Sequence, residues 1–101
     1  MKGMRLLEMD HALEERVKQA ARALIAAGAR EVYLFGSAAR GEMRTDSDVD
    51  LAVSGLPAEV FFHAMGEAGD ILQSELDLID LDEDTPFTRY LQQEGELVRV
   101  A

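Results

Sequence analysis

Two aspartates, Asp48 and Asp50, are separated by a single residue in a stretch of alternating apolar and polar side chains. In a strand, side chains two residues apart point to the same face, roughly 6.6 Å apart at about 3.3 Å per residue. Two carboxylates held in this way can share a pair of divalent cations, which lie about 3.5–4 Å apart in sites that act on phosphorus. Without counterions, two such charges at ~4 Å repel by on the order of 4 kcal/mol at an effective dielectric of about 20. The spacing therefore indicates a site for divalent cations.

A third aspartate, Asp77, lies between Leu76 and Leu78 in a second alternating segment. If that segment is a strand, the two leucines share one face and Asp77 points to the other. Neighbouring strands lie only about 4.8 Å apart, so Asp77 on an adjacent strand would reach the same cations as Asp48 and Asp50. Ligands that are all oxygen suit Mg²⁺ or Mn²⁺. The sequence thus predicts one site shared by three carboxylates.

An apolar segment that ends in Gly36-Ser37 precedes these acids. Glycine allows a tight turn and the close approach of a ligand, and backbone N–H groups at the start of a helix attract anions. The turn lacks the Gly-Lys-Ser/Thr ending of a P-loop and the glycine spacing of a dinucleotide site. Taken alone it would be a structural turn, but together with the aspartates it indicates a place for a phosphate group.

Apolar periodicity divides the chain into alternating helices and strands. It predicts a helix over 10–28 with Asp10 as its N-cap, strands over 31–35 and 48–53, and a helix that starts at Pro57. A strand over 75–81 follows, then a helix with Thr85 as N-cap and Pro86 as first residue that stops at Gly95, and a short strand over 97–100. No repeat, linker or low-complexity tract interrupts the pattern. We therefore expect a single domain over 1–101, of the α+β class, with a small mixed sheet and helices packed on one face.

The same periodicity assigns side chains to the core or to the surface. In the strand over 48–53, the residues expected to face the core are Val49, Leu51 and Val53, and those expected on the other face are Asp48, Asp50 and Ala52. On the later helices, the residues expected to point inward are Val60, Phe61, Ala64 and Ala68, and then Phe87, Tyr90 and Leu91. One face of the sheet is then the core, and the other carries the site.

The composition limits the partners of this protein. Its 101 residues include 20 acidic and 10 basic side chains, which gives a formal net charge of -10. This field repels a phosphate backbone, so we expect no direct nucleic-acid partner and instead a protein with a basic surface. The absence of cysteine excludes disulfides, thiolate catalysis and cysteine zinc sites. No apolar run suits a signal peptide or a membrane span, so we expect a cytoplasmic protein with no membrane partner.

Together these motifs resemble the minimal nucleotidyltransferases of the DNA polymerase beta superfamily, of the HEPN/MNT antitoxin type. That family combines a Gly-Ser turn, a short helix with Arg-Gly, a Ser-Asp-x-Asp-Leu strand and a later Asp-Leu-x-Asp-Leu strand. The matching residues are Gly36-Ser37, Arg40-Gly41, Ser47-Asp48-Val49-Asp50-Leu51 and Leu76-Asp77-Leu78-Ile79-Asp80-Leu81. The resemblance covers about residues 32–101 and implies the nucleotidyltransferase fold.

By this resemblance, Asp48, Asp50 and Asp77 form the catalytic and metal-binding set. The first two would hold two Mg²⁺ or Mn²⁺ ions, and Asp77 would complete the site and help to activate the attacking hydroxyl. The reaction implied is transfer of a nucleoside monophosphate, from ATP or a similar triphosphate, to a hydroxyl with release of pyrophosphate.

The resemblance also implies a set of nucleotide-binding residues: Gly36, Ser37, Arg40 and Ser47. Gly36 and Ser37 would hold the β and γ phosphates. Arg40 would either reach a phosphate oxygen or pair with one of the many acids. The triphosphate end of the nucleotide is thereby assigned, whereas the base is not.

Stand-alone members of this family resemble antitoxins of two-gene modules, paired with a helical HEPN-type ribonuclease toxin. In some of these systems the transferase adds AMP to a tyrosine of the toxin, so the resemblance implies a toxin partner. Two alternatives stay open: a non-catalytic module that covers the toxin, and a transferase for a small molecule such as an aminoglycoside. The latter would need a homodimer to build its pocket. The sequence also leaves open a homo-oligomer formed through an apolar helix face.

Overall fold

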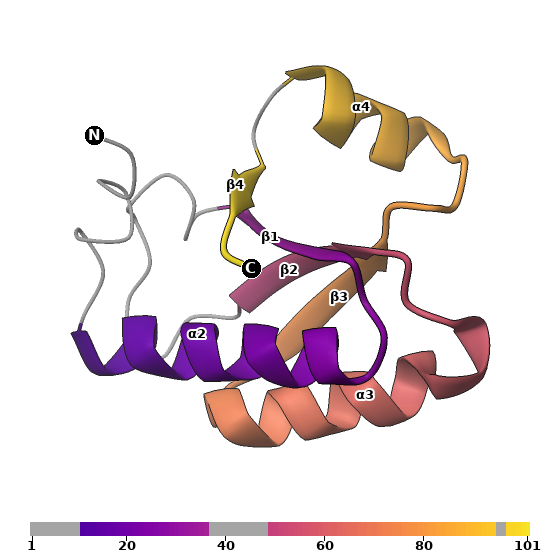
Figure 1. The fold of residues 1–101 in the computed structure, drawn as a ribbon. Helices are drawn as coiled ribbons and strands as arrows, with labels where there is room; N and C mark the ends of the chain where they lie inside the picture. Colours follow the sequence, from indigo (N-terminus) through magenta and orange to yellow (C-terminus); the bar gives the residue numbers. More distant parts are fainter. Residues whose placement is uncertain (1–10, 37–48, 95–96) are drawn as a thin grey trace.

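The computed structural model describes residues 11–36, 49–94 and 97–101 of the chain. These residues form three helices and four strands (Figure 1). In chain order the elements are α2 (His11–Ala26), β1 (Glu31–Phe35), β2 (Val49–Ser54), α3 (Ala58–Leu72), β3 (Leu76–Asp80), α4 (Pro86–Glu94) and β4 (Val98–Arg99). The predicted elements are thus confirmed within these residues, while Asp10, expected to cap the first helix, and Gly95, expected to end the last, lie outside them.

The four strands form one mixed sheet in the order β3-β2-β1-β4. Strand β1 pairs antiparallel with both β2 and β4, whereas β2 and β3 are parallel. Parallel neighbours require a crossover connection, and α3 supplies it. The expected fold class, α+β with a small mixed sheet, is confirmed.

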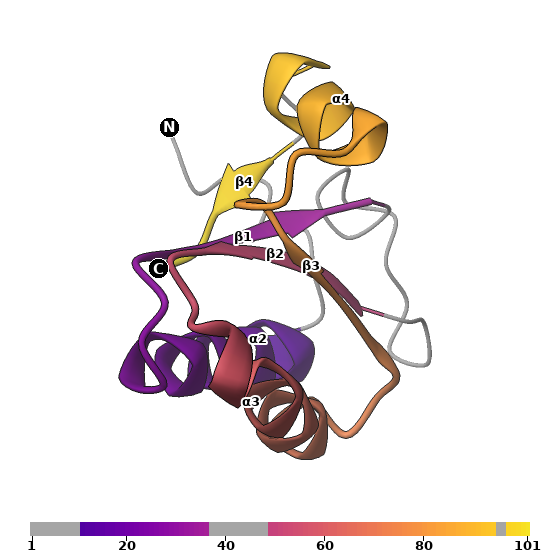
Figure 2. The ribbon, with the colours of Figure 1, turned by 90° about the vertical axis from the view of Figure 1, so that its right-hand side faces the viewer.

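Helices α2 and α3 lie side by side on one face of the sheet, as Figure 2 shows. The predicted inward residues of β2, Val49, Leu51 and Val53, are fully buried there. They pack in one hydrophobic cluster with buried residues of the two helices, among them Leu13, Val17, Leu24, Ala64, Ala68 and Leu72. The alternating apolar residues of the strand and the apolar stripes of the two helices therefore pack into one core.

Helix α3 begins where the sequence predicts, directly after Pro57. Pro57 stands at the N-cap with φ −62°, and Gln73 ends the helix in the left-handed region at φ 57°. The Gln73 N–H donates to the carbonyl of Gly69, a bond typical of helix ends. Arg16 of α2 donates from Nε to the Leu72 carbonyl at 3.0 Å, which places a cation at the negative end of α3. The two helices are therefore joined by a polar contact as well as by the core.

The opposite face of the sheet, which we call the open face, carries the side chains of Glu31, Tyr33 and Phe35 of β1, Asp50, Ala52 and Ser54 of β2, and Asp77 and Ile79 of β3. Helix α4 lies on this side, away from α2 and α3 (Figure 2). Its Leu91 completes a small second cluster with Phe35, Ala52 and Leu81. The open face is thus partly a second core and not only a site.

Helix α4 presents a different face to the sheet than its apolar stripe predicts. Leu91 is buried as expected, but Phe87 and Tyr90 are 47% and 50% exposed. The polar Thr88 is buried in their place. The loop before this helix has backbone N–H and carbonyl groups that need hydrogen-bond partners. A hydroxyl at position 88 can supply them, whereas an aromatic ring cannot.

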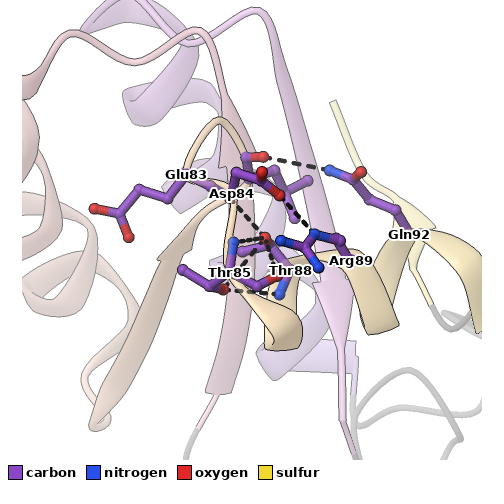
Figure 3. A network of polar contacts seen from close by, with 7 residues as sticks. Glu83, Asp84, Thr85, Thr88, Arg89 and Gln92 are labelled. Atoms are coloured by element: carbon purple, nitrogen blue, oxygen red, sulfur yellow. Dashed lines mark hydrogen bonds and ion pairs between the residues drawn. The ribbon is translucent and has the colours of Figure 1, made fainter.

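Figure 3 shows the polar network that begins α4. The Thr88 hydroxyl donates to the Glu83 carbonyl at 2.6 Å and accepts from the Thr85 N–H at 3.0 Å. Thr85 Oγ1 in turn accepts from the Thr88 N–H at 3.1 Å, which confirms Thr85 as the N-cap. A capping box places Glu or Gln at this third helical position, and Thr88 takes that role here. The network fixes the loop between β3 and α4.

None of the helices within the described ranges is long and apolar enough to cross a membrane.

We predict that Thr88→Val, which keeps the shape but removes the hydroxyl, lowers the free energy of unfolding by about 1–3 kcal/mol, because backbone groups of Glu83 and Thr85 lose their partner. Urea denaturation of the full chain measures this loss. Thr88→Ser retains the hydroxyl and should recover most of it. Equal stability of Thr88→Val and the parent chain would contradict the assignment.

Candidate active site

Two of the three predicted carboxylates come from neighbouring strands. Asp50 of β2 and Asp77 of β3 are direct partners in the parallel register. Partners in a parallel pair point to the same face, and adjacent strands lie about 4.8 Å apart. Asp77 is exposed and Asp50 is half-buried. The structure therefore brings Asp50 and Asp77 together at one position of the open face.

Gly36 packs against one of these two carboxylates, that of Asp50. It follows Phe35, the antiparallel partner of Asp50, and has φ 75°. A Cβ atom added to Gly36 would overlap a carboxylate oxygen of Asp50 and lie 3.2 Å from its Cγ. Glycine is thus required twice, for a positive φ and for the close approach of the Asp50 side chain. The turn after β1 and the acid on β2 form one compact arrangement.

The remaining predicted site residues, Ser37, Arg40, Ser47 and Asp48, lie outside the described residues. Within the part of the chain that is described, no group of three or more histidine, aspartate or glutamate side chains could hold a metal ion. Asp50 and Asp77 supply two of the three carboxylates in the predicted set. Their oxygen atoms are hard donors of the kind that Mg²⁺ and Mn²⁺ bind. The chemistry of the described donors fits a divalent cation.

The sequence reasoning missed the aromatic residues next to this pair. The rings of Phe35 and Phe87 meet edge to face, with centroids 6.1 Å apart and planes inclined by 64°. Phe87 was expected in the core, but its ring is half-exposed. The Phe61-Phe62 pair carried a usable signal, since Phe61 belongs to the inward stripe predicted for its helix and Phe62 does not. Phe61 is half-buried and Phe62 is exposed.

We predict that Gly36→Ala lowers the free energy of unfolding by about 1–3 kcal/mol, because a side chain at positive φ is strained and its Cβ displaces the Asp50 carboxylate. Gly66→Ala is the matched control: its Cβ would meet no atom within 4 Å. Gly66 lies inside α3, so that substitution should stabilise by about 0.5–1 kcal/mol. Thermal or urea unfolding of both variants checks the contrast. Similar effects at the two positions would refute the packing of Gly36 against Asp50.

The end of the open face farther from Asp50 holds a separate polar cluster. The Tyr33 hydroxyl donates to the Glu31 carboxylate at 2.8 Å, and Arg99 lies 3.7 Å from the other Glu31 oxygen. The bond from Tyr33 lowers the pKa of Glu31 below its ordinary value of 4.5, with Arg99 adding to the effect and partial burial opposing it. The same bond, with some burial, raises the pKa of the Tyr33 hydroxyl above 10.0. This cluster ties β1 to β4.

We predict that Tyr33→Phe raises the pKa of Glu31 back toward 4.5, because the carboxylate loses its main donor. The depressed pKa of Glu31 stabilises the fold above pH 4.5, and this stability is lost as the pH falls through the lower, folded-state pKa. The variant should therefore lose less stability between neutral and acidic pH than the parent. NMR titration of the Glu31 carboxyl measures the pKa, and an unchanged value would contradict the bond.

Comparison with known proteins identifies the class to which this fold and site belong. The model of the family described as "Polymerase beta, Nucleotidyltransferase" matches residues 24–99, well over half of the 101-residue chain. The chain therefore belongs to the polymerase beta nucleotidyltransferase family, as its motifs predict. A search of the curated proteins found no significant match.

Solved structures share the fold. A structure described as a minimal nucleotidyltransferase has a TM-score of 0.70 and 28% identity, and the match covers 86% of this chain and 91% of that chain. A toxin-antitoxin complex with AMP-PNP matches with a TM-score of 0.64 and 23% identity, over 86% of this chain and 71% of that one. A tri-AMPylated HEPN toxin in complex with the MNT antitoxin, from Shewanella oneidensis, gives a TM-score of 0.63 and 19% identity, over 88% and 71%. The two complexes show likeness of fold alone.

Proposed function

We propose that this chain is a metal-dependent nucleotidyltransferase that moves AMP from ATP to a hydroxyl of a protein partner, and that it serves as the antitoxin of a HEPN/MNT pair. Membership of the nucleotidyltransferase family supports the reaction class. The fold is shared with antitoxin structures, one of which is a complex with AMP-PNP and another with an AMPylated HEPN toxin. The expected localisation, where ATP and such a toxin would both be present, is the cytoplasm.

The observation that carries the proposal is the register that sets Asp50 beside Asp77, with Gly36 packed against Asp50. Two carboxylates on directly paired strand positions repel each other, and divalent cations bound between them would offset that repulsion. We assign Asp48, Asp50 and Asp77 as the residues that would hold two Mg²⁺ or Mn²⁺ ions. When bound, these ions would offset the charge of the triphosphate and stabilise the attacking and leaving oxygens.

Other residues of the chain would bind the triphosphate and accept the proton of the attacking hydroxyl. Gly36 and Ser37 would present backbone N–H groups to the β and γ phosphates, with Arg40 and Ser47 completing the nucleotide site. Asp77, exposed on β3, would accept the proton of the attacking hydroxyl. That oxygen forms a bond to the α phosphorus, the bond from the α phosphorus to the bridging oxygen breaks, and pyrophosphate leaves. The product is an AMP ester of the acceptor.

We predict that Asp50→Asn and Asp77→Asn each reduce transfer of radiolabelled AMP to a co-purified partner by about a hundredfold or more. Several kcal/mol of charge stabilisation would be lost, and each ~1.4 kcal/mol is a factor of ten. We expect Asp48→Asn to reduce AMP transfer to a similar extent. The charge-matched control is Asp70→Asn, an exposed residue of α3 that should retain transfer.

The same assay separates the rival functions. Transfer that survives in both Asp50→Asn and Asp77→Asn would overturn the proposed site. If the double variant loses transfer but still neutralises the partner fully, the chain acts as a covering module. Turnover of aminoglycosides or amino alcohols with ATP, with none on protein, would instead establish a small-molecule acceptor.

A further inference from the structure

An aromatic groove runs along the outer edge of the sheet, where β3 is the last strand among the described residues. The groove has a volume of about 380 Å³ and is lined by the start of α3, by β3 and by the start of α4. Its lining includes the aromatic residues Phe61, Phe62 and Phe87 together with Leu78 and Ile79. Phe62 is 75% exposed and Phe87 47% exposed. Exposed large apolar side chains gathered at one place mark an interaction site.

The groove lies next to the candidate active site. Ile79, which lines it, follows Asp77 by two residues on β3, so both side chains lie on the open face about 7 Å apart along the strand. Phe87, which also lines the groove, touches Phe35, the cross-strand partner of Asp50. A molecule seated in the groove would therefore pass beside the two carboxylates.

The charge of the groove selects the kind of molecule that it fits. Asp80 and Glu83 line it, and no basic side chain of the described residues does. Figure 3 shows the Glu83 carboxylate pointing away from the network that fixes its backbone. The whole chain carries a formal net charge of -10. An anionic nucleotide is disfavoured in this position, whereas a cationic protein surface is attracted to it.

We propose that this groove docks the acceptor protein, through a segment with apolar or aromatic side chains flanked by lysine or arginine. This inference rests on the proposed function and adds to it the place and chemistry of acceptor recognition. The aromatic side chains act as anchors, which is their usual role at protein interfaces, and Asp80 and Glu83 set the charge preference. Docking there would present an acceptor hydroxyl to Asp77 from the open edge of the sheet.

The direct test uses two synthetic amphipathic helical peptides with the same leucine and phenylalanine face, one with lysine and one with glutamate on the polar face. We expect the lysine peptide to bind the full chain in fluorescence anisotropy, with NMR shifts in α3, β3 and α4. The glutamate peptide should bind at least about tenfold more weakly. Phe62→Ala should lower affinity for the lysine peptide by about tenfold or more.

Ile25→Ala is the matched control, since Ile25 is also an exposed apolar residue, 37% accessible, but lies on α2 away from the groove. It should leave peptide affinity unchanged. Equal effects of Phe62→Ala and Ile25→Ala, or equal binding of the two peptides, would overturn the proposal. So would a Phe62→Ala variant that loses affinity for Mg·ATP in calorimetry while peptide binding persists, because the groove would then belong to the nucleotide.

Different results would overturn the docking groove and the nucleotidyltransferase assignment. If Asp50→Asn abolishes AMP transfer to the partner but Phe62→Ala leaves the KM for that partner unchanged, the docking groove is wrong and the enzyme assignment stands. If no transfer occurs but the lysine peptide binds and Phe62→Ala weakens it, the groove stands without the chemistry. We expect Phe62→Ala to raise the KM for the protein acceptor about tenfold, with the KM for ATP unchanged.

Discussion

The parallel pairing of β2 with β3 is the constraint on which the rest of the structure depends. It sets Asp50 opposite Asp77, and α3 must cross the sheet to make it possible. A shift of one residue would turn Asp77 and Ile79 toward the core and would turn Leu76 and Leu78 away from it. Such a slip is prevented because Leu78 and the inward residues of β2 are locked in the cluster beneath α2 and α3. Burial of the apolar side chains on one face of the sheet thus fixes the positions of Asp50 and Asp77 on the other face.

Local patterns were sufficient to predict most of the scaffold. The alternation of β2 placed Val49, Leu51 and Val53 in the core and Asp50 opposite, because burial of a strand depends on its own period. The course of α4 was predicted from its cap, but its inward face was not. Thr88 is buried and Tyr90 exposed because the loop before the helix supplies backbone groups that only a hydroxyl satisfies. That preference depends on a tertiary neighbour, which helical spacing does not encode.

The candidate site, like the scaffold, could be predicted from the sequence only in part. Each aspartate could be assigned to a strand face from sequence, yet their adjacency depends on strand order, which periodicity leaves undetermined. A family resemblance filled that gap, and the register now places Asp50 and Asp77 side by side. The packing of Gly36 against Asp50 was not foreseen, since the sequence explained this glycine by a tight turn and by the approach of a phosphate. The groove escaped prediction because the exposure of Phe62 and Phe87 depends on how α3, β3 and α4 pack in space, which their own periodicities do not specify.

Helix α4 is attached differently from the other two helices. It touches the sheet through Leu91 and an edge contact from Phe87, and the hydroxyl network at its start holds it to the preceding loop. Regions with few buried apolar contacts open at lower free energy than the core, as independent cooperative units. The amide hydrogens of α4 should therefore exchange with solvent well before those of β1 and β2. The protein can then open α4, which lines the proposed groove, while the strands that carry the carboxylates stay folded. A very small molecule can in this way adapt to a partner in one part and hold the reacting groups rigid in another.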